Sequence, residues 1–256
     1  MRILSYEQIR KINIHYPNTY VNSLKEKGIL MKKTLITILA TLFLTSTAYA
    51  GQLGMGVTGS MAAIAAEGSD SDKNGAADDS GRTATASNNA FIGSIFAEYT
   101  MDGGMTFGLD YIPGSADVSS STLKRLDVTP DGNEAVQDDG TRTANAEVEN
   151  HYTLYAEIPV HEGVYLKGGY VEMDVNTLDT TTIATGGSYG NTSVDGLMYG
   201  VGYKTAYGSG NAYYKIEGTH TEFDTLSINS STTDKGDKIT ADLDVTKLTF
   251  ALGFNF

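Results

Sequence analysis

The chain has 256 residues, no cysteine and no tryptophan, and its 31 Asp+Glu outnumber its 18 Lys+Arg. The lack of cysteine excludes disulfides and thiolate metal sites, and the acidic excess argues against a nucleic-acid partner. Seven of the 18 basic residues but only two of the 31 acidic ones fall in the first fifty positions, so positions 51–256 carry a net charge near −18.

Residues 31–50 have the layout of a secretory signal peptide. Met31 and two lysines precede an apolar-rich run from Leu35 to Leu44, and a small-x-small cleavage pattern ends at Ala50. The apolar run is shorter than the roughly 20 residues that a membrane-spanning helix needs. We therefore expect export and cleavage after Ala50. Residues 1–30 are expected to be an upstream extension outside the fold, or alternatively a long n-region, and residues 51–256 to form one domain.

Alternation of apolar with small or polar side chains recurs along 51–256 and predicts strands, taken here in chain order. The eight predicted strands lie near 52–62, 90–100, 105–111, 148–158, 164–170, 197–203, 212–218 and 247–256. Their connections alternate between long and short along the chain. The long ones fall at about 67–89, 113–145, 174–192 and 223–241, and the short ones at 101–104, 161–163 and 206–210.

This sorting of connections predicts an all-β fold, an eight-stranded antiparallel up-and-down transmembrane β-barrel with four long extracellular loops and short periplasmic turns. Inside a bilayer every backbone amide needs a partner, and a closed barrel supplies those partners. The last strand has nine residues from Leu248 to Phe256, which fits the 9–11 residues that a tilted strand uses to cross the hydrocarbon.

The chain ends on Phe256, with Leu248, Phe250, Leu252 and Phe254 at alternate positions before it. This ending resembles the C-terminal assembly signal of Gram-negative outer-membrane barrels. The whole of 51–256 resembles, in its pattern, the small eight-stranded proteins typified by outer membrane protein A, outer membrane protein W and the opacity-type surface proteins. The resemblance implies an outer-membrane location, contact with lipids including lipopolysaccharide, and biogenesis through periplasmic chaperones and the barrel-assembly machinery.

Charged residues on the inward parity are expected to meet in the periplasmic half of the barrel. They are Glu98, Glu157, Lys167, Lys204, Lys215 and Glu217. Because unpaired buried charges are costly and eight strands leave an interior that side chains can fill, the simplest arrangement is an ion-paired network that closes the lumen. This predicts a structural or surface-interaction role, with the loops as the contact surface and no ligand indicated. The alternative is a narrow porin for small solutes, lined by the same charges.

Two histidines raise catalytic alternatives. His151 lies two residues from Glu149 on the inward parity, a pairing that suits either proton transfer or a packed polar network. His220 lies on the lipid-facing parity, and an assumed register between the sixth and seventh strands sets it beside Ser193 and Asp195, as acyl hydrolysis would need. A lipid-modifying enzyme is thus a third hypothesis. No motif of such enzymes accompanies it, so we expect no catalytic residues.

The first long connection contains a partial calcium-loop pattern. Asp70, Asp72 and Asn74 match its opening and Asp78 its ninth position, but Gly81 stands where the bidentate glutamate belongs. The sequence therefore predicts at most a weak calcium site here and indicates no other cofactor.

Overall fold

The computed structural model describes residues 51–71, 82–118, 123–129, 138–178, 180–181, 188–231 and 238–256. The upstream extension and signal peptide expected at 1–30 and 31–50 lie outside these ranges, as do Asp72, Asn74 and Asp78 of the calcium pattern. Within the described ranges, no helix has the length and apolar character to cross a membrane.

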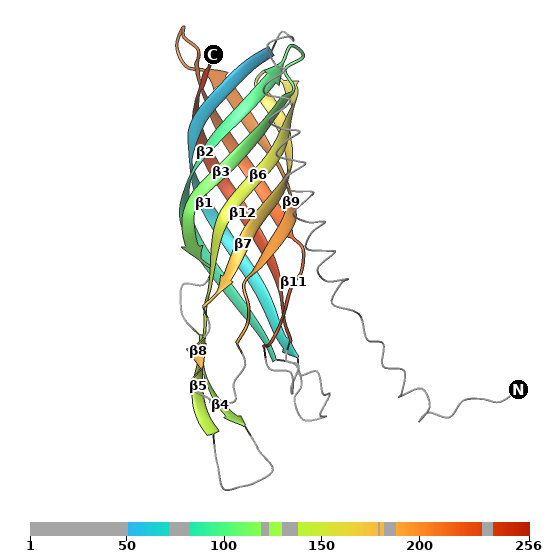
Figure 1. The fold of residues 1–256 in the computed structure, drawn as a ribbon. Coiled ribbons are helices and arrows are strands. Elements are labelled where there is room, and N and C mark those ends of the chain that lie inside the picture. Colours follow the sequence, from blue (N-terminus) through green and yellow to red (C-terminus); the bar gives the residue numbers. More distant parts are fainter. Residues whose placement is uncertain are drawn as a thin grey trace, which may run out of the picture. The chain divides into compact units, whose positions relative to one another are not determined.

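Eight of the described strands close into an antiparallel ring, in which β12 pairs back onto β1 (Figure 1). The ring strands are β1 (Gly51–Ser71), β2 (Arg82–Met101), β3 (Thr106–Asp117), β6 (Ala146–His161), β7 (Val164–Thr177), β9 (Thr192–Ala206), β10 (Ala212–Phe223) and β12 (Lys238–Asn255). The closing ladder runs from Gly54↔Asn255 to Ser71↔Lys238. The predicted eight-stranded up-and-down barrel is confirmed.

The short connections fall where they were expected, at 102–105, 162–163 and 207–211. We call this end of the ring, which also holds Gly51 and Phe256, the turn half, and the opposite end the loop half. Outer-membrane barrels direct their short turns to the periplasm. The amide of Phe256 donates to the carbonyl of Leu53 at 2.8 Å, so the two chain ends meet in the turn half.

The loop half holds more regular structure than the sequence predicted. β1 continues to Ser71 and β7 to Thr177, inside ranges expected to be linkers. The connection from 113 to 145 contains a hairpin of β4 (Leu123–Thr129) and β5 (Asp138–Ala144), and β8 (Thr180–Thr181) pairs with β5. β11 (Leu226–Asn229) pairs with β12 beyond the end of β10.

The strands continue into the loop half because the polarity of their inner and outer faces inverts along their length. In the turn half large apolar side chains face outward, as Leu252 and Phe254 do, with about half of their surface exposed. In the loop half the inward positions become apolar instead, and their buried members form one cluster. These are Val171, Met173, Val175, Val194 and Phe223, packed with Met198 and Tyr155. Acidic residues such as Glu172, Asp174 and Glu222 alternate with them. A barrel wall in lipid has an apolar outer face, whereas a barrel wall in water has a polar outer face and an apolar interior. The inversion therefore marks where the strands leave the hydrocarbon.

A β-bulge at Asn150 overturns one prediction made from the sequence. Asn150 has φ of 51°, and the β6–β7 register shifts between Glu149 and Tyr152. Because a bulge inserts one extra residue, it exchanges the faces of the residues beyond it. Val148 therefore packs against the inner apolar cluster, and Glu149 lies opposite the outward Asp174. The predicted inward pairing of Glu149 with His151 is wrong.

The inversion predicts how the folding free energy depends on depth in the membrane. We expect Leu252→Arg, in the middle of the apolar face of β12, to cost about 2–4 kcal/mol of folding free energy. On the same strand and face, Thr246→Arg should cost about 0–1 kcal/mol, because this position lies at the edge of the apolar belt. Reversible urea unfolding in lipid vesicles measures both. Equal costs at the two positions would contradict the placement of the membrane boundary.

Candidate functional site

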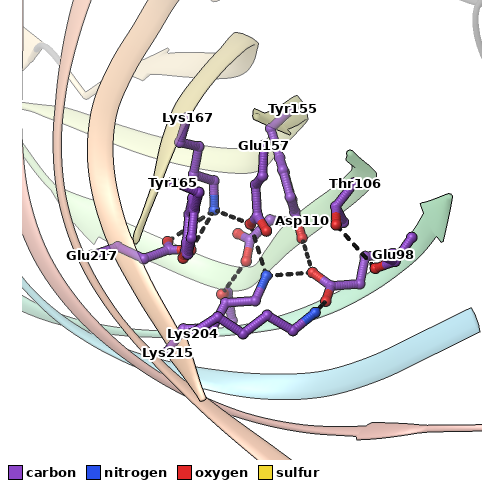
Figure 2. Close-up of polar contacts among 12 residues, drawn as sticks. Glu98, Thr106, Asp110, Tyr155, Glu157, Tyr165, Lys167, Lys204, Lys215 and Glu217 are labelled. Carbon is purple, nitrogen blue, oxygen red and sulfur yellow. Dashed lines mark hydrogen bonds and ion pairs between the residues drawn. The ribbon is translucent and has the colours of Figure 1, made fainter. Parts of the chain in front are cut away.

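The six inward charges meet in one network in the turn half (Figure 2). Its centre is Glu98 on β2, whose side chain is wholly buried. This carboxylate accepts hydrogen bonds from Lys204 Nζ at 2.8 Å and from Lys215 Nζ. Two tyrosine hydroxyls also donate to it, Tyr155 at 3.0 Å and Tyr213 at 2.8 Å. Three strands besides β2, namely β6, β9 and β10, thus direct four donors at one carboxylate.

The remaining carboxylates are joined to the same lysines. Lys215 Nζ also donates to Glu157 at 2.7 Å, and Lys167 Nζ lies 3.7 Å from Glu157. Lys167 further donates to both oxygens of Glu217, at 2.8 and 3.0 Å. Three glutamates and three lysines give the network no net charge. Since a buried ion is tolerated only when it is paired and hydrogen-bonded, this neutrality lets all six remain in the lumen.

Three tyrosines complete the network, and each faces a glycine on a neighbouring strand. The cross-strand pairs are Tyr155↔Gly108, Tyr165↔Gly202 and Tyr213↔Gly253. A Cβ added at any of these glycines would lie 2.2–2.3 Å from the ring Cζ, so the rings occupy the space that a side chain would take. Tyr165 donates to Glu217 at 2.6 Å, and the Lys167 ammonium lies 3.9 Å from the centre of the Tyr155 ring. The rings fill the gaps that the charged side chains leave.

Next to the network, toward the loop half, the lumen holds a polar cavity of about 30 Å³. Asp110, Lys247, Thr153 and Thr219 are among the residues that line it. The hydroxyls of Thr153 and Thr219 have no hydrogen-bond partner within the part of the chain that the structure describes. A space of this size holds about one water molecule, which is far too little for a hydrated solute.

The ring does not assemble the proposed acyl-hydrolysis triad, because the assumed register is wrong. His220 lies opposite Tyr199, and Asp195 lies four residues further along β9. Four residues of extended chain span about 13 Å. His220 Nδ1 instead lies 2.9 Å from Thr246 Oγ1, and its ring meets the Tyr199 ring edge-on at 5.5 Å.

The predicted assembly signal lies on the outer face of β12 and just beyond its end. Leu248, Phe250, Leu252, Phe254 and Phe256 are each 47–68% exposed, and the rings of Phe254 and Phe256 meet at 5.4 Å. Their recognition during assembly stays a prediction. Asp70 falls in β1, but nothing in the described residues bears on calcium binding by the first long connection.

Sequence reasoning found the six charges but missed the three tyrosines. Tyr155, Tyr165 and Tyr213 lie on the polar parity of their strands, between positions that were assigned to the lipid face. A large aromatic residue on an otherwise small or polar parity was the available signal. It indicates a filled lumen when a glycine lies at the paired position of the next strand.

The network predicts a large loss of stability when its central carboxylate is neutralised. Glu98→Gln leaves Lys204 and Lys215 short of a counter-charge in a buried site, and we expect it to cost about 3–5 kcal/mol of folding free energy. The exposed Glu67→Gln on β1 is the control, with an expected change below about 0.5 kcal/mol. Urea unfolding in vesicles compares the two. A change at Glu98 as small as that at Glu67 would contradict the network.

Scans of the sequence against protein-family models and against curated proteins find no match. Among solved structures, the chain is similar to outer membrane protein OprG from Pseudomonas aeruginosa, at 12% identity and a TM-score of 0.44, over 81% of this chain and 97% of that one. It is similar to Neisserial surface protein A, at 14% identity and a TM-score of 0.30, over 77% and 97% of the two chains. It also resembles the outer membrane protease OmpT from Escherichia coli, at 12% identity and a TM-score of 0.41, over 80% and 97%.

These TM-scores lie below 0.5, so the architecture rests on the chain's own strand ladder. That ladder closes on itself, an apolar belt surrounds its turn half, and a neutral polar network fills the lumen inside the belt. A closed strand ring with lipid outside and polar groups inside is the form in which β-structure crosses a membrane. The described part of residues 51–256 thus forms an eight-stranded transmembrane β-barrel of the outer-membrane type.

Proposed function

We propose that this barrel has a structural or surface-interaction role in the outer membrane and that its lumen is closed to ions and small solutes. The observation that carries the proposal is the network around Glu98, in which three carboxylates, three ammonium groups and three tyrosine rings fill the turn half. Opening a path there would separate ion pairs inside a low-dielectric lumen. The cost of leaving a buried charge unpaired opposes such opening.

The narrow-porin alternative uses the same residues but asks them to line a path. Two observations weigh against it. Lys215 is 1% exposed and is shared between Glu98 and Glu157, so it is committed to partners and not presented to a channel. The cavity next to the network measures only about 30 Å³. An eight-stranded ring also leaves an interior that side chains fill, whereas aqueous channels need more strands.

The proposed surface-interaction role rests on the loop half, where the outer faces of the strands carry acidic side chains. They include Glu172, Asp174, Asp195, Glu222, Asp242 and Asp244. Beyond the hydrocarbon these groups face solvent, so they supply an anionic contact surface. The proposal further assigns lipopolysaccharide to the surroundings of the barrel. It also holds that the barrel-assembly machinery recognises the ending Leu248–Phe256 during biogenesis, and that periplasmic chaperones bind the chain at that stage.

The proposal assigns no catalytic role to the barrel. The separation of His220 from Asp195 along the strands supports this, because a general base must lie within hydrogen-bond reach of its orienting group. His220 has a local explanation in its contacts with Tyr199 and Thr246 on the outer face.

Conductance tests the closed lumen. Residues 51–256, refolded and shown by heat-modifiable gel mobility to form a barrel, should give no discrete steps in a planar bilayer. Reproducible steps from the unaltered chain would overturn the proposal and favour the porin.

A double variant shows whether the absence of conductance depends on the network. Lys215→Ala with Tyr213→Ala removes the shared lysine and one ring, and should raise the frequency of conducting events if the folded barrel still forms. The control is Tyr199→Ala with Glu222→Ala, a bonded pair of the outer face, which should stay silent. Conductance in this control as well would show that leakage does not depend on the network.

A further inference from the structure

Two charged residues of the lumen lie outside the network around Glu98. Asp110 on β3 and Lys247 on β12 both line the polar cavity of about 30 Å³. Among the described residues, the carboxylate of Asp110 has one hydrogen-bond partner, Ser94, whose Oγ donates to it at 2.6 Å. The Lys247 ammonium makes no hydrogen bond or ion pair with any residue that the structure describes. The two opposite charges therefore share a cavity without direct contact.

Each of these charges has a threonine with an unpartnered hydroxyl as its cross-strand neighbour. Asp110 lies opposite Thr153 on β6, and Lys247 lies opposite Thr219 on β10. The two threonines are 3% and 5% exposed, and both line the same cavity. Neither hydroxyl has a partner within the described ranges. Because a buried hydroxyl without a hydrogen bond is costly, native proteins nearly always supply a partner for it.

The two cross-strand pairs lie on opposite walls of the barrel. In the ring, β3 and β6 are the third and fourth strands, whereas β10 and β12 are the seventh and eighth. A closed ring of eight strands sets the third opposite the seventh and the fourth opposite the eighth. The cavity therefore lies between an acidic wall and a basic wall, and each wall contributes one unpartnered hydroxyl.

The opposite charges of the two walls limit what the cavity can hold. An ion of either sign is attracted by one wall and repelled by the other, so little offsets the cost of removing it from bulk water. A neutral molecule that both donates and accepts hydrogen bonds suits both walls. The volume restricts that molecule to the size of water, which needs at least about 10–15 Å³.

We propose that this cavity is a binding site for one water molecule that joins the two walls. The water accepts a hydrogen bond from Lys247 Nζ and donates one to the Asp110 carboxylate. Its remaining donor and acceptor positions serve the hydroxyls of Thr153 and Thr219. Buried waters in proteins have two to four such partners. Asp110 and Lys247 thereby form a water-mediated ion pair, which adds a second neutral layer beside the network around Glu98.

Replacing each threonine by valine tests for the water through the sign of the stability change. Valine keeps the shape of threonine and lacks the hydroxyl. With the water bound, Thr153→Val and Thr219→Val each remove one of its hydrogen bonds, so both should lower the urea midpoint of unfolding in vesicles. Without it, the substitution only removes an unfavourably buried hydroxyl. An unchanged or higher midpoint for either variant would therefore overturn the proposal.

Thr106→Val is the matched control for these two variants. Thr106 is 2% exposed, and its Oγ1 lies 2.9 Å from Thr100 Oγ1. Its hydroxyl thus has a direct partner, and its loss should lower the urea midpoint whatever the cavity holds. The control gives the size of the shift that a partnered lumen hydroxyl produces, including any effect of valine on the strand itself.

Diffraction from the unaltered barrel identifies the occupant. Crystals grown in rubidium bromide should show a density peak within hydrogen-bond reach of Asp110 and Lys247 that carries no anomalous signal. Rubidium and bromide scatter anomalously at their absorption edges, whereas water does not. An anomalous peak at this position would assign the site to an ion and overturn the proposal. The lack of any peak that reaches both walls would overturn it as well.

Discussion

The rest of the structure depends on the need to pair backbone amides inside hydrocarbon. The ladder from β12 back to β1 meets that need for the first and last strands of the ring. Closure creates an interior, and the two-residue period of a strand directs every second side chain into it. In the turn half these side chains are charged, and burial then requires that their signs balance and that their donors and acceptors meet. The network around Glu98 follows from closure and need not be selected for transport.

The same constraint explains why polarity inverts in the loop half. Once the strands leave lipid, their outer faces can carry acids such as Asp174, and their inner faces can carry a core of the kind that soluble proteins have, with Val175 and Phe223. One ring therefore contains two interiors, a polar one within the membrane and an apolar one above it.

The sequence predicted what depends on local periodicity. The two-residue alternation placed Glu98, Lys204 and Lys215 inside the barrel, and the short gaps between predicted strands placed the turns. It failed where pairing between distant strands decides. The bulge at Asn150 exchanges the faces of β6, the β9–β10 register separates His220 from Asp195, and strands continue past the lipid because apolar residues move to the other parity. The Tyr155↔Gly108 contact and its two counterparts are equally a matter of register, which a single sequence does not carry.

The central claim is that the buried charges act as one neutral unit, and a double-mutant cycle tests it most directly. Glu98→Gln and Lys215→Met are made singly and together, and the free energy of unfolding of each barrel is measured in vesicles. The account predicts that the double variant loses less stability than the two single losses combined, by about 0.5–3 kcal/mol, because each single variant leaves the other charge without its partner. Additive losses would show that Glu98 and Lys215 do not depend on each other and would contradict the account.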